Sequence, residues 1–398
     1  MKKEPIIVAI KKSVLFCLIL LIVYAALFLN SIGPWLMTKN LKYPLLTFIG
    51  DTKTSMGISF ETPVKCKATI YYGENTSLME VPLTETSARM IHKFNLTGLR
   101  PSTEYYYLIN STTVNYDFMN KIFHFKTAPN ASLSLPVRFA VFGDTRPDIW
   151  GNTQHSYIIS KMITHNPTFI MNVGDIVMGP SYANEWDRFY YETYQCTLHG
   201  IPYMVTMGNH EEHEGPGGME DKGRTYYKYM HFPDTNFYYH FNYSNIMVIS
   251  LNIADPDNIT QAQINWLNNT LFEANKSSDI DWIFVFSHYP PYSSTENTPS
   301  IINKIVPLIK LYKVDIYFSA HHHHYERIIK DGITYIITGG GGAETDLYLQ
   351  PSEWTVTKAI AFQYCIIDIT NKTLNFKCYN QDGITILDQF NLTSWRNP

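Results

Sequence analysis

The chain has 398 residues, which is more than one hydrophobic core usually holds, so we expect two domains and an additional segment. Apolar residues make up 45% of the chain and aromatic residues 15%, with 29 tyrosines, which indicates a folded protein rich in β structure. The formal net charge of −4 offers no basic surface, which argues against nucleic-acid binding.

An apolar run lies near the beginning of the chain. Residues 14–29 are all apolar, and the apolar residues that follow extend the run to about 20, the length that spans a bilayer. A cleaved signal peptide is the alternative, with Ser31 and Gly33 at the cleavage site, but Pro34 directly after them disfavours cleavage. We therefore predict that residues 1–37 form a cytoplasmic tip and an uncleaved signal-anchor transmembrane helix. The amino terminus is placed inside by four preceding lysines, Lys2, Lys3, Lys11 and Lys12.

The remainder of the chain is predicted to lie outside the cytoplasm, and to be secreted if the first segment is cleaved. Without the first 37 residues, 27 basic and 34 acidic side chains remain, a net charge of −7. About half of the Asn-x-Ser/Thr sequons are expected by chance in so Asn- and Thr-rich a chain. All ten lie beyond the apolar run and predict N-glycans, at Asn75, Asn95, Asn110, Asn130, Asn242, Asn258, Asn268, Asn275, Asn371 and Asn391.

The five cysteines are too few for a disulfide scaffold. One lies in the apolar run, and Cys66 and Cys196 are predicted to be buried free thiols. Cys365 and Cys378 flank a predicted hairpin that turns at residues 371–372. With a two-residue loop these cysteines face each other at a non-hydrogen-bonded pair, where a disulfide is feasible, whereas a shift of one residue in register removes it.

Residues 38–130 form the first predicted domain. Short alternating runs such as "MGISFET", "CKATIYYG" and "KIFHFKTAP" are separated by turn signals, which is typical of a β-sandwich. The stretch "LTGLRPSTEYYYLI" resembles the tyrosine corner of fibronectin type III domains, with Leu99, Pro101, Thr103 and Tyr105 at the characteristic positions. Because no cluster of catalytic residue types occurs here, this domain is predicted to support the rest of the chain.

Residues 131–398 form the second predicted domain, in which strands alternate with helices in α/β layers. Ligands collect at the carboxyl ends of strands in such sheets. A single Gly-Asp or Asn-His after a strand is usually a turn, but five consecutive strand ends with metal-competent side chains predict a site for a pair of ions. In chain order these side chains are Asp144, Asp175, Asn209 with His210, His288, and His321 with His323.

The motifs GDT, GDI, GNHE, SHYPPY and AHHHHYER, in this order, resemble the calcineurin-like metallophosphoesterases, and the purple acid phosphatase branch in particular. The resemblance extends over the fibronectin-like domain and implies that a four-layer αββα domain follows it. It also implies two metal ions, such as Fe, Zn or Mn. Asp175 would bridge both ions, Asp144 and His323 would complete one position, and Asn209, His288 and His321 would complete the other.

The same resemblance implies that the site hydrolyses phosphate esters. A water activated by the metal ions attacks phosphorus, and His210 lies beside the phosphate as a proton donor or electrophilic stabiliser. His322 and His324 take the variable positions of the four-histidine run and are predicted to be spacers or outer groups. Tyr325 and the two residues after it match the stretch that anchors this loop to the next strand.

Two departures from the family pattern concern one metal position. Met178 replaces the iron-binding tyrosine of the purple enzymes, so we expect no tyrosinate colour. Arg146 replaces a histidine of other branches, and it either forks toward phosphate oxygens or pairs with an aspartate. His155 and His213 are alternative ligands there, although we interpret both as ordinary surface or loop histidines. The family's later histidines are replaced by "STENTPS", which leaves substrate recognition open.

Three hypotheses of function result. The leading one is a membrane-anchored, outward-facing phosphomonoesterase, with His210 and Arg146 as its catalytic residues and a small phosphoester as its substrate. The second keeps the metal site and changes the substrate to phosphodiesters or nucleotides. The third is a non-catalytic surface protein whose fibronectin-like domain mediates adhesion, and retention of all six metal ligands disfavours it.

Overall fold

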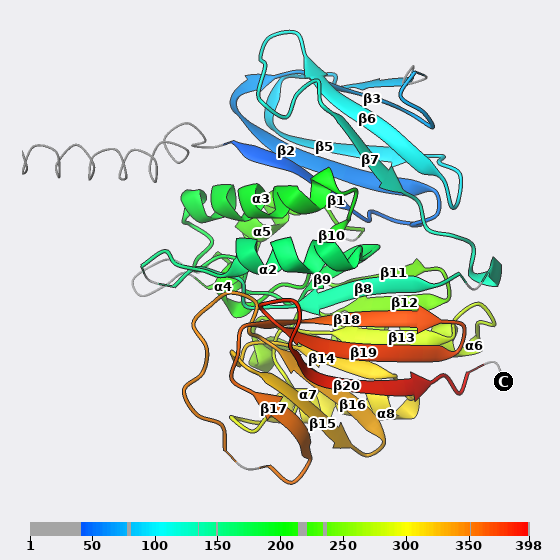
Figure 1. The fold of residues 1–398 in the computed structure, drawn as a ribbon, viewed down its shortest axis with the longest axis vertical. Coiled ribbons are helices and arrows are strands. Elements are labelled where there is room, and N and C mark those ends of the chain that lie inside the picture. The colour runs from blue at the N-terminus through cyan, green and yellow to red at the C-terminus, as the bar shows by residue number, and fades with distance from the viewer. Residues whose placement is uncertain are drawn as a thin grey trace, which may run out of the picture.

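The structure, a computed structural model, describes residues 41–77, 81–133, 135–148, 150–213, 221–233, 237–350 and 352–396. The described strands form four sheets, two in the first part of the chain and two larger ones in the second (Figure 1). The predicted signal anchor in residues 1–37 lies outside the described residues. No helix within the described ranges combines the length and the apolar character needed to span a bilayer.

The first part is a β-sandwich, as the alternating runs predict. One sheet has the strand order β1-β2-β5 and the other has the order β4-β3-β6-β7. The described strands are β1 (Lys42–Thr47), β2 (Ser55–Cys66), β3 (Ala68–Gly73), β4 (Val81–Thr84), β5 (Arg89–Thr97), β6 (Glu104–Ser111) and β7 (Ile122–Lys126). The predicted tyrosine corner is present, because the backbone N–H of Arg100 donates to the hydroxyl of the buried Tyr105 at 3.0 Å.

The second part is built on two sheets. The six-stranded sheet has the order β10-β9-β8-β18-β19-β20, and the seven-stranded sheet has the order β11-β12-β13-β14-β16-β15-β17. The strands are β8 (Val137–Phe142), β9 (Phe169–Asn172), β10 (Tyr203–Val205), β11 (Tyr239–Tyr243), β12 (Ile246–Ser250), β13 (Trp282–Phe286), β14 (Ile316–Ser319), β15 (Tyr325–Lys330), β16 (Ile333–Thr338), β17 (Thr355–Ala359), β18 (Gln363–Thr370), β19 (Thr373–Asn380) and β20 (Ile386–Thr393).

The two sheets pack face to face and helices cover their outer faces, so the predicted four-layer αββα arrangement is confirmed (Figure 1). Phe139 of β8 meets Phe284 of β13 across the central interface, with ring centroids 5.4 Å apart. The described helices are α2 (His155–Met162), α3 (Ala183–Leu198), α4 (Asn209–Glu212), α5 (Arg224–Tyr229), α6 (Gln261–Lys276), α7 (Pro299–Lys304) and α8 (Val306–Leu311). The first two pack on the six-stranded sheet, and the last three pack on the seven-stranded sheet.

The hairpin of β18 and β19 has the predicted two-residue turn at residues 371–372. Cys365 therefore faces Cys378 across the two strands. Both thiols are buried and free, and the structure contains no disulfide between them. Cys66 and Cys196 are buried free thiols, as predicted.

Because of His231, the folded protein is expected to lose stability in acid. It follows α5 at the junction with the sandwich, where its carbonyl accepts a hydrogen bond from Thr47. Burial, together with the charge of Lys93, lowers the pKa of His231 from its ordinary value of 6.5 to about 4. Because the folded state favours the neutral ring, its contribution is present above pH 6.5 and is lost as the pH falls toward 4, by about 2–3 kcal/mol.

Urea unfolding at pH 7 and at pH 4.5 measures this effect. His231→Gln is expected to lose less stability between the two pH values than the unaltered protein does. An equal loss in both proteins would assign the acid sensitivity to other groups.

Candidate metal centre

The candidate ligands follow the carboxyl ends of five strands that meet at one edge of the two packed sheets. Asp144 follows β8 and Asp175 follows β9, both in the six-stranded sheet. Asn209 follows β10 and begins α4. His288 follows β13 and His321 follows β14, both in the seven-stranded sheet. Packing the sheets face to face therefore brings residues from five separate segments to one place.

Four of these side chains converge closely. Nε2 of His288 lies 3.0 Å from Oδ1 of Asn209 and 3.3 Å from Oδ1 of Asp175. Nδ1 of His321 lies 3.1 Å from the same Asn209 oxygen. We call the space that these four side chains enclose the four-ligand position.

Asp144 and His323 lie beside this position. Nε2 of His323 is 3.4 Å from Oδ1 of Asp144, and Oδ2 of Asp144 accepts a hydrogen bond from the backbone N–H of His321. Asp144, Asp175 and His288 each present a ligand atom within 4.8 Å of the others. We call the space bounded by Asp144, Asp175 and His323 the three-ligand position.

The side chains present fit metal ions. Asp144 is fully buried, and its Oδ1 has no hydrogen-bond partner among the described residues. A buried carboxylate oxygen that accepts no hydrogen bond is costly unless a cation compensates it. Carboxylate, amide oxygen and imidazole together suit ions such as zinc, iron and manganese. The six predicted ligands are thus brought together, at a place that requires positive charge.

The pKa values of Asp175 and His288 indicate the same requirement for positive charge. Burial raises the pKa of Asp175, but the charges of His288 and His210 outweigh it and hold this pKa well below its usual range. Burial opposes protonation of His288, yet the charge of Asp175 raises its pKa to about 9. The carboxylates therefore favour a positive charge on the neighbouring histidines. Bound metal ions would supply this positive charge instead.

Backbone conformation supports the ligand geometry. Three candidate ligands lie in the left-handed region, with φ of 55° at Asp144, 57° at Asp175 and 67° at His321. Such conformations are uncommon outside glycine and are concentrated at functional sites. Glycines let other segments come close, because a Cβ at Gly208 would lie 2.2 Å from Oδ1 of Asp175, and one at Gly339 would lie 2.5 Å from Oδ2 of Asp144. Gly339 begins a run of four glycines at residues 339–342, and its backbone therefore passes close to the site.

Glu211 is a functional residue that the sequence analysis missed. It is completely buried, and its carboxylate accepts hydrogen bonds from the backbone N–H groups of Asp175, Ile176 and Val177 at 2.8–3.1 Å. It also accepts one from Gly208 at 2.8 Å. Glu211 thus holds the loop that carries one ligand against the segment that carries another. Its place as the last residue of the GNHE motif was the sequence feature that could have identified Glu211.

Glu211→Gln is expected to weaken metal binding about 10–100-fold, the usual effect of losing a group that orients ligands. The amide keeps the size of the side chain but exchanges one acceptor oxygen for an NH₂ group that faces backbone donors. Competition with a chromophoric chelator measures the affinity. Glu273→Gln on α6, on a side chain that is 70% exposed, is the matched control. Equal affinities in the two variants would contradict the role of Glu211.

His210 lies beside the ligands with one ring nitrogen committed. Its Nδ1–H donates to the carbonyl of Met178 at 2.7 Å, and its Nε2 lies 3.8 Å from Oδ2 of Asp175. The side chain is 27% exposed, so solvent and substrate can reach it. His210 thus lies beside Asp175, and its position next to a bound phosphate stays a prediction.

Arg146 and Met178 lie together at the edge of the site. Nη1 of Arg146 is 3.6 Å from Sδ of Met178 and 3.5 Å from Oε2 of Glu344. The predicted alternative of a salt bridge to an aspartate is wrong, since the ion pair is made with Glu344. That residue lies in the loop after β16, which packs beside the site.

The other histidines lie outside the ligand groups. His155 was predicted to be a surface or loop residue, and this is wrong, because it is buried between Glu192 and Tyr203 at 2.8 and 3.1 Å. His213 is near Glu212, and its side chain is 43% exposed. His324 is buried and contacts Asp346 and Glu326, whereas His322 is near the carbonyl of Glu296.

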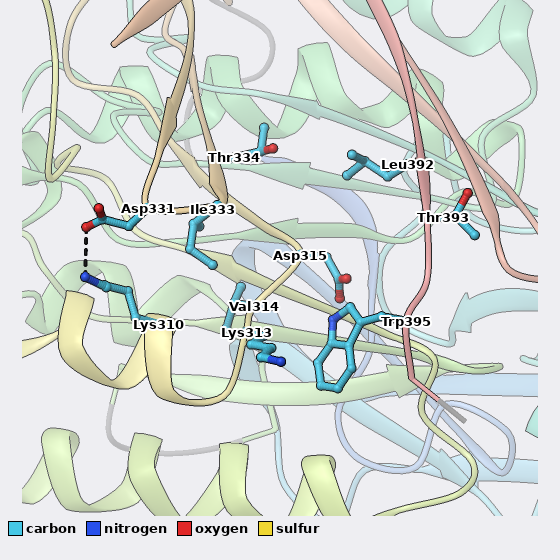
Figure 2. Close-up of a pocket in the computed structure, with 11 residues that line it drawn as sticks. Lys310, Lys313, Val314, Asp315, Asp331, Ile333, Thr334, Leu392, Thr393 and Trp395 are labelled. Carbon is cyan, nitrogen blue, oxygen red and sulfur yellow. Dashed lines mark hydrogen bonds and ion pairs between the residues drawn. The ribbon is translucent and has the colours of Figure 1, made fainter. Parts of the chain in front are cut away.

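A separate cavity of about 420 Å³ lies away from this site (Figure 2). Its wall includes Val314 and Asp315, just before β14, and Gly332, just before β16. It therefore lies at the amino ends of these parallel strands, opposite the edge that carries His321. Lys310 and Asp331 on its wall pair with each other at 2.8 Å.

An αββα domain with Asp, Asn and His side chains gathered at its strand ends is the architecture of a metallophosphoesterase. Residues 137–325 match the calcineurin-like phosphoesterase family, and residues 43–127 match the N-terminal domain of purple acid phosphatases. The chain therefore carries a calcineurin-like phosphoesterase domain behind a purple acid phosphatase N-terminal domain. The resemblance inferred from the motifs is confirmed.

Named relatives and a solved structure agree with these matches. Purple acid phosphatase 15 of Arabidopsis thaliana is 28% identical over 319 residues, which cover 68% of this chain and 57% of that protein. Probable purple acid phosphatase 20 of the same plant is 28% identical over 327 residues, which cover 75% and 73%. Purple acid phosphatase PPD1 from yellow lupin seeds shares the fold, with a TM-score of 0.76 at 18% identity over 89% of this chain and 74% of the lupin chain.

Proposed function

We propose that this chain hydrolyses phosphate monoesters outside the cytoplasm, with two metal ions bound by Asp144, Asp175, Asn209, His288, His321 and His323. The observation that carries the proposal is the convergence of these side chains around the buried Oδ1 of Asp144, which accepts no hydrogen bond among the described residues and has Nε2 of His323 3.4 Å away. When bound, such ions lower the pKa of a coordinated water and neutralise charge on the phosphoryl oxygens.

His210 is proposed to move a proton to the leaving group. Because its Nδ1 keeps a proton for the Met178 carbonyl, Nε2 is the nitrogen that can exchange one. The imidazolium form of His210 donates from Nε2 to the leaving alkoxide oxygen and returns to the neutral ring.

Arg146 is proposed to be the second catalytic residue, in contact with phosphoryl oxygens. Its side chain is 8% exposed, and its Nε has no hydrogen-bond partner among the described residues. A planar guanidinium with an available N–H matches the geometry of a phosphate group.

We further propose that residues 1–37 anchor the chain in a membrane with the catalytic domain outside, and that the chain carries N-glycans. The ten sequon asparagines are all described residues. Each is exposed or partly exposed, which supports glycosylation. Membrane anchoring rests on the apolar run and the lysines that precede it.

The test uses purified protein without a histidine tag, since a tag would itself bind metal. Hydrolysis of nitrophenyl phosphate and bis-nitrophenyl phosphate is compared, and metal content is measured by mass spectrometry. Faster hydrolysis of the monoester supports the proposal, whereas faster hydrolysis of the diester replaces it with a phosphodiesterase or nucleotide hydrolase. A folded protein without metal and without turnover of either ester would leave the non-catalytic surface protein.

A further inference from the structure

The two metal positions differ in the number of side chains that can fill them. The four-ligand position has Asp175, Asn209, His288 and His321, which approach one another at 3.0–3.3 Å. The three-ligand position has Asp144 and His323 and shares Asp175 with its neighbour. Two of the three side chains therefore belong only to the three-ligand position, whereas three of the four belong only to the four-ligand position.

A fixed positive charge lies beside the three-ligand position. Arg146 follows Asp144 by two residues and is 6% exposed. Its Nη1 contacts the Pro147 carbonyl at 3.2 Å and Met178 Sδ at 3.6 Å. Glu344 links Arg146 to this position, because its carboxylate pairs with Arg146 and its backbone carbonyl accepts a hydrogen bond from Nδ1 of His323. A guanidinium charge beside this position disfavours a metal ion within it.

Arg146 is itself incompletely neutralised. Its ion-pair partner, Glu344, is 3.5 Å away and its side chain is 57% exposed, so solvent weakens the interaction. Nε of Arg146 is buried without a partner among the described residues. A buried guanidinium in this state requires an additional acceptor. A phosphate dianion provides both the acceptor oxygens and the missing negative charge.

We propose that the two positions fill in order: one ion enters the four-ligand position of the free protein, and the second enters the three-ligand position only together with a phosphate group bound by Arg146. This inference rests on the proposed function. The phosphate group would supply oxygen donors beside the second ion, and its negative charge would offset the repulsion from Arg146. Coupling of this kind is reciprocal, so the second ion strengthens phosphate binding by the factor by which phosphate strengthens its own binding.

Equilibrium dialysis against Mn²⁺, with metal counted by mass spectrometry, tests the order of filling without any measurement of turnover. The full chain is first stripped with a chelator and then titrated with and without inorganic phosphate. One Mn²⁺ per chain is expected without phosphate. The second is expected to bind on the order of 100-fold more tightly when phosphate is present, near the upper end of typical coupling between two ligands.

Substitutions at Arg146 separate charge from ligand number. Arg146→His removes the charge and supplies an imidazole, so two ions are expected without phosphate. Arg146→Gln removes the charge alone, so the second ion is expected to bind more tightly than in the unaltered protein but less tightly than in Arg146→His. Arg138→His is the matched control, because Arg138 pairs with Asp368 at the far end of β8, and it is expected to retain the unaltered pattern.

Each other outcome overturns the inference. Two ions of equal affinity without phosphate would show that Arg146 leaves the three-ligand position unaffected, while the proposed function would stand. A single ion both with and without phosphate would make the centre mononuclear. No ion under either condition would overturn the proposed function as well, and this result distinguishes the two failures.

Discussion

Asp175→Asn is expected to lower kcat/KM for a phosphate monoester by about 10³-fold or more, since metal ions contribute several kcal/mol to such reactions. The side chain is 2% exposed and borders both the four-ligand and the three-ligand position. An asparagine keeps its shape but loses the negative charge and one of the two acceptor oxygens, so both positions weaken together. Metal content measured beside turnover is expected to fall in the same variant.

Asparagine is the informative replacement because the backbone at Asp175 is left-handed, with φ of 57°. Asparagine tolerates this conformation better than most residues, so the fold is expected to persist, and circular dichroism checks this. Asp368→Asn, on β18 and paired with Arg138, is the matched control and is expected to keep activity within about twofold. Retained metal and turnover in Asp175→Asn would refute the proposed bridging role.

The strands and the ligands that follow them could be predicted from the sequence because both depend on local signals. A run such as "WIFVF" is buried along its whole length in β13, as expected of a parallel strand covered on both faces. The polar residue that follows such a run must lie at the sheet edge, and parallel strands place these edges together. His288 and His321 could thus be assigned before any contact between them was known.

Interactions between distant segments could not be predicted in this way. Glu211 accepts hydrogen bonds from backbone groups 34–36 residues earlier in the chain, and the contact exists only because β9 and β10 pair in parallel. Arg146 forms its ion pair with Glu344, 198 residues away, whereas the sequence analysis expected a phosphate or an aspartate as its partner. His155 lies on the inward face of α2, and its burial depends on Glu192 of α3. Periodicity locates such residues but does not identify their partners.

Lys42→Met is expected to cost about 3–5 kcal/mol of the free energy of unfolding, the usual effect of removing one partner from a buried ion pair. Lys42 lies on β1 and is 1% exposed. Its ammonium group contacts the carboxylate of Glu61 on β2 and, at 2.8 Å, that of Asp187 on α3. The lysine therefore joins the sandwich to the phosphoesterase domain, and methionine leaves two buried carboxylates without the cation between them.

Urea unfolding of matched variants measures this contribution. Lys53→Met removes an exposed pair with Asp51, in which the charged atoms are 3.7 Å apart, and is expected to cost less than about 1 kcal/mol. Lys42→Met combined with Glu61→Gln is expected to recover part of the loss, because only one buried carboxylate then remains at the domain contact. If Lys42→Met costs no more than Lys53→Met, the buried lysine does not hold the two domains together. Because Lys42 is remote from the ligands, the folded fraction of Lys42→Met should retain normal metal content, which separates stability from catalysis.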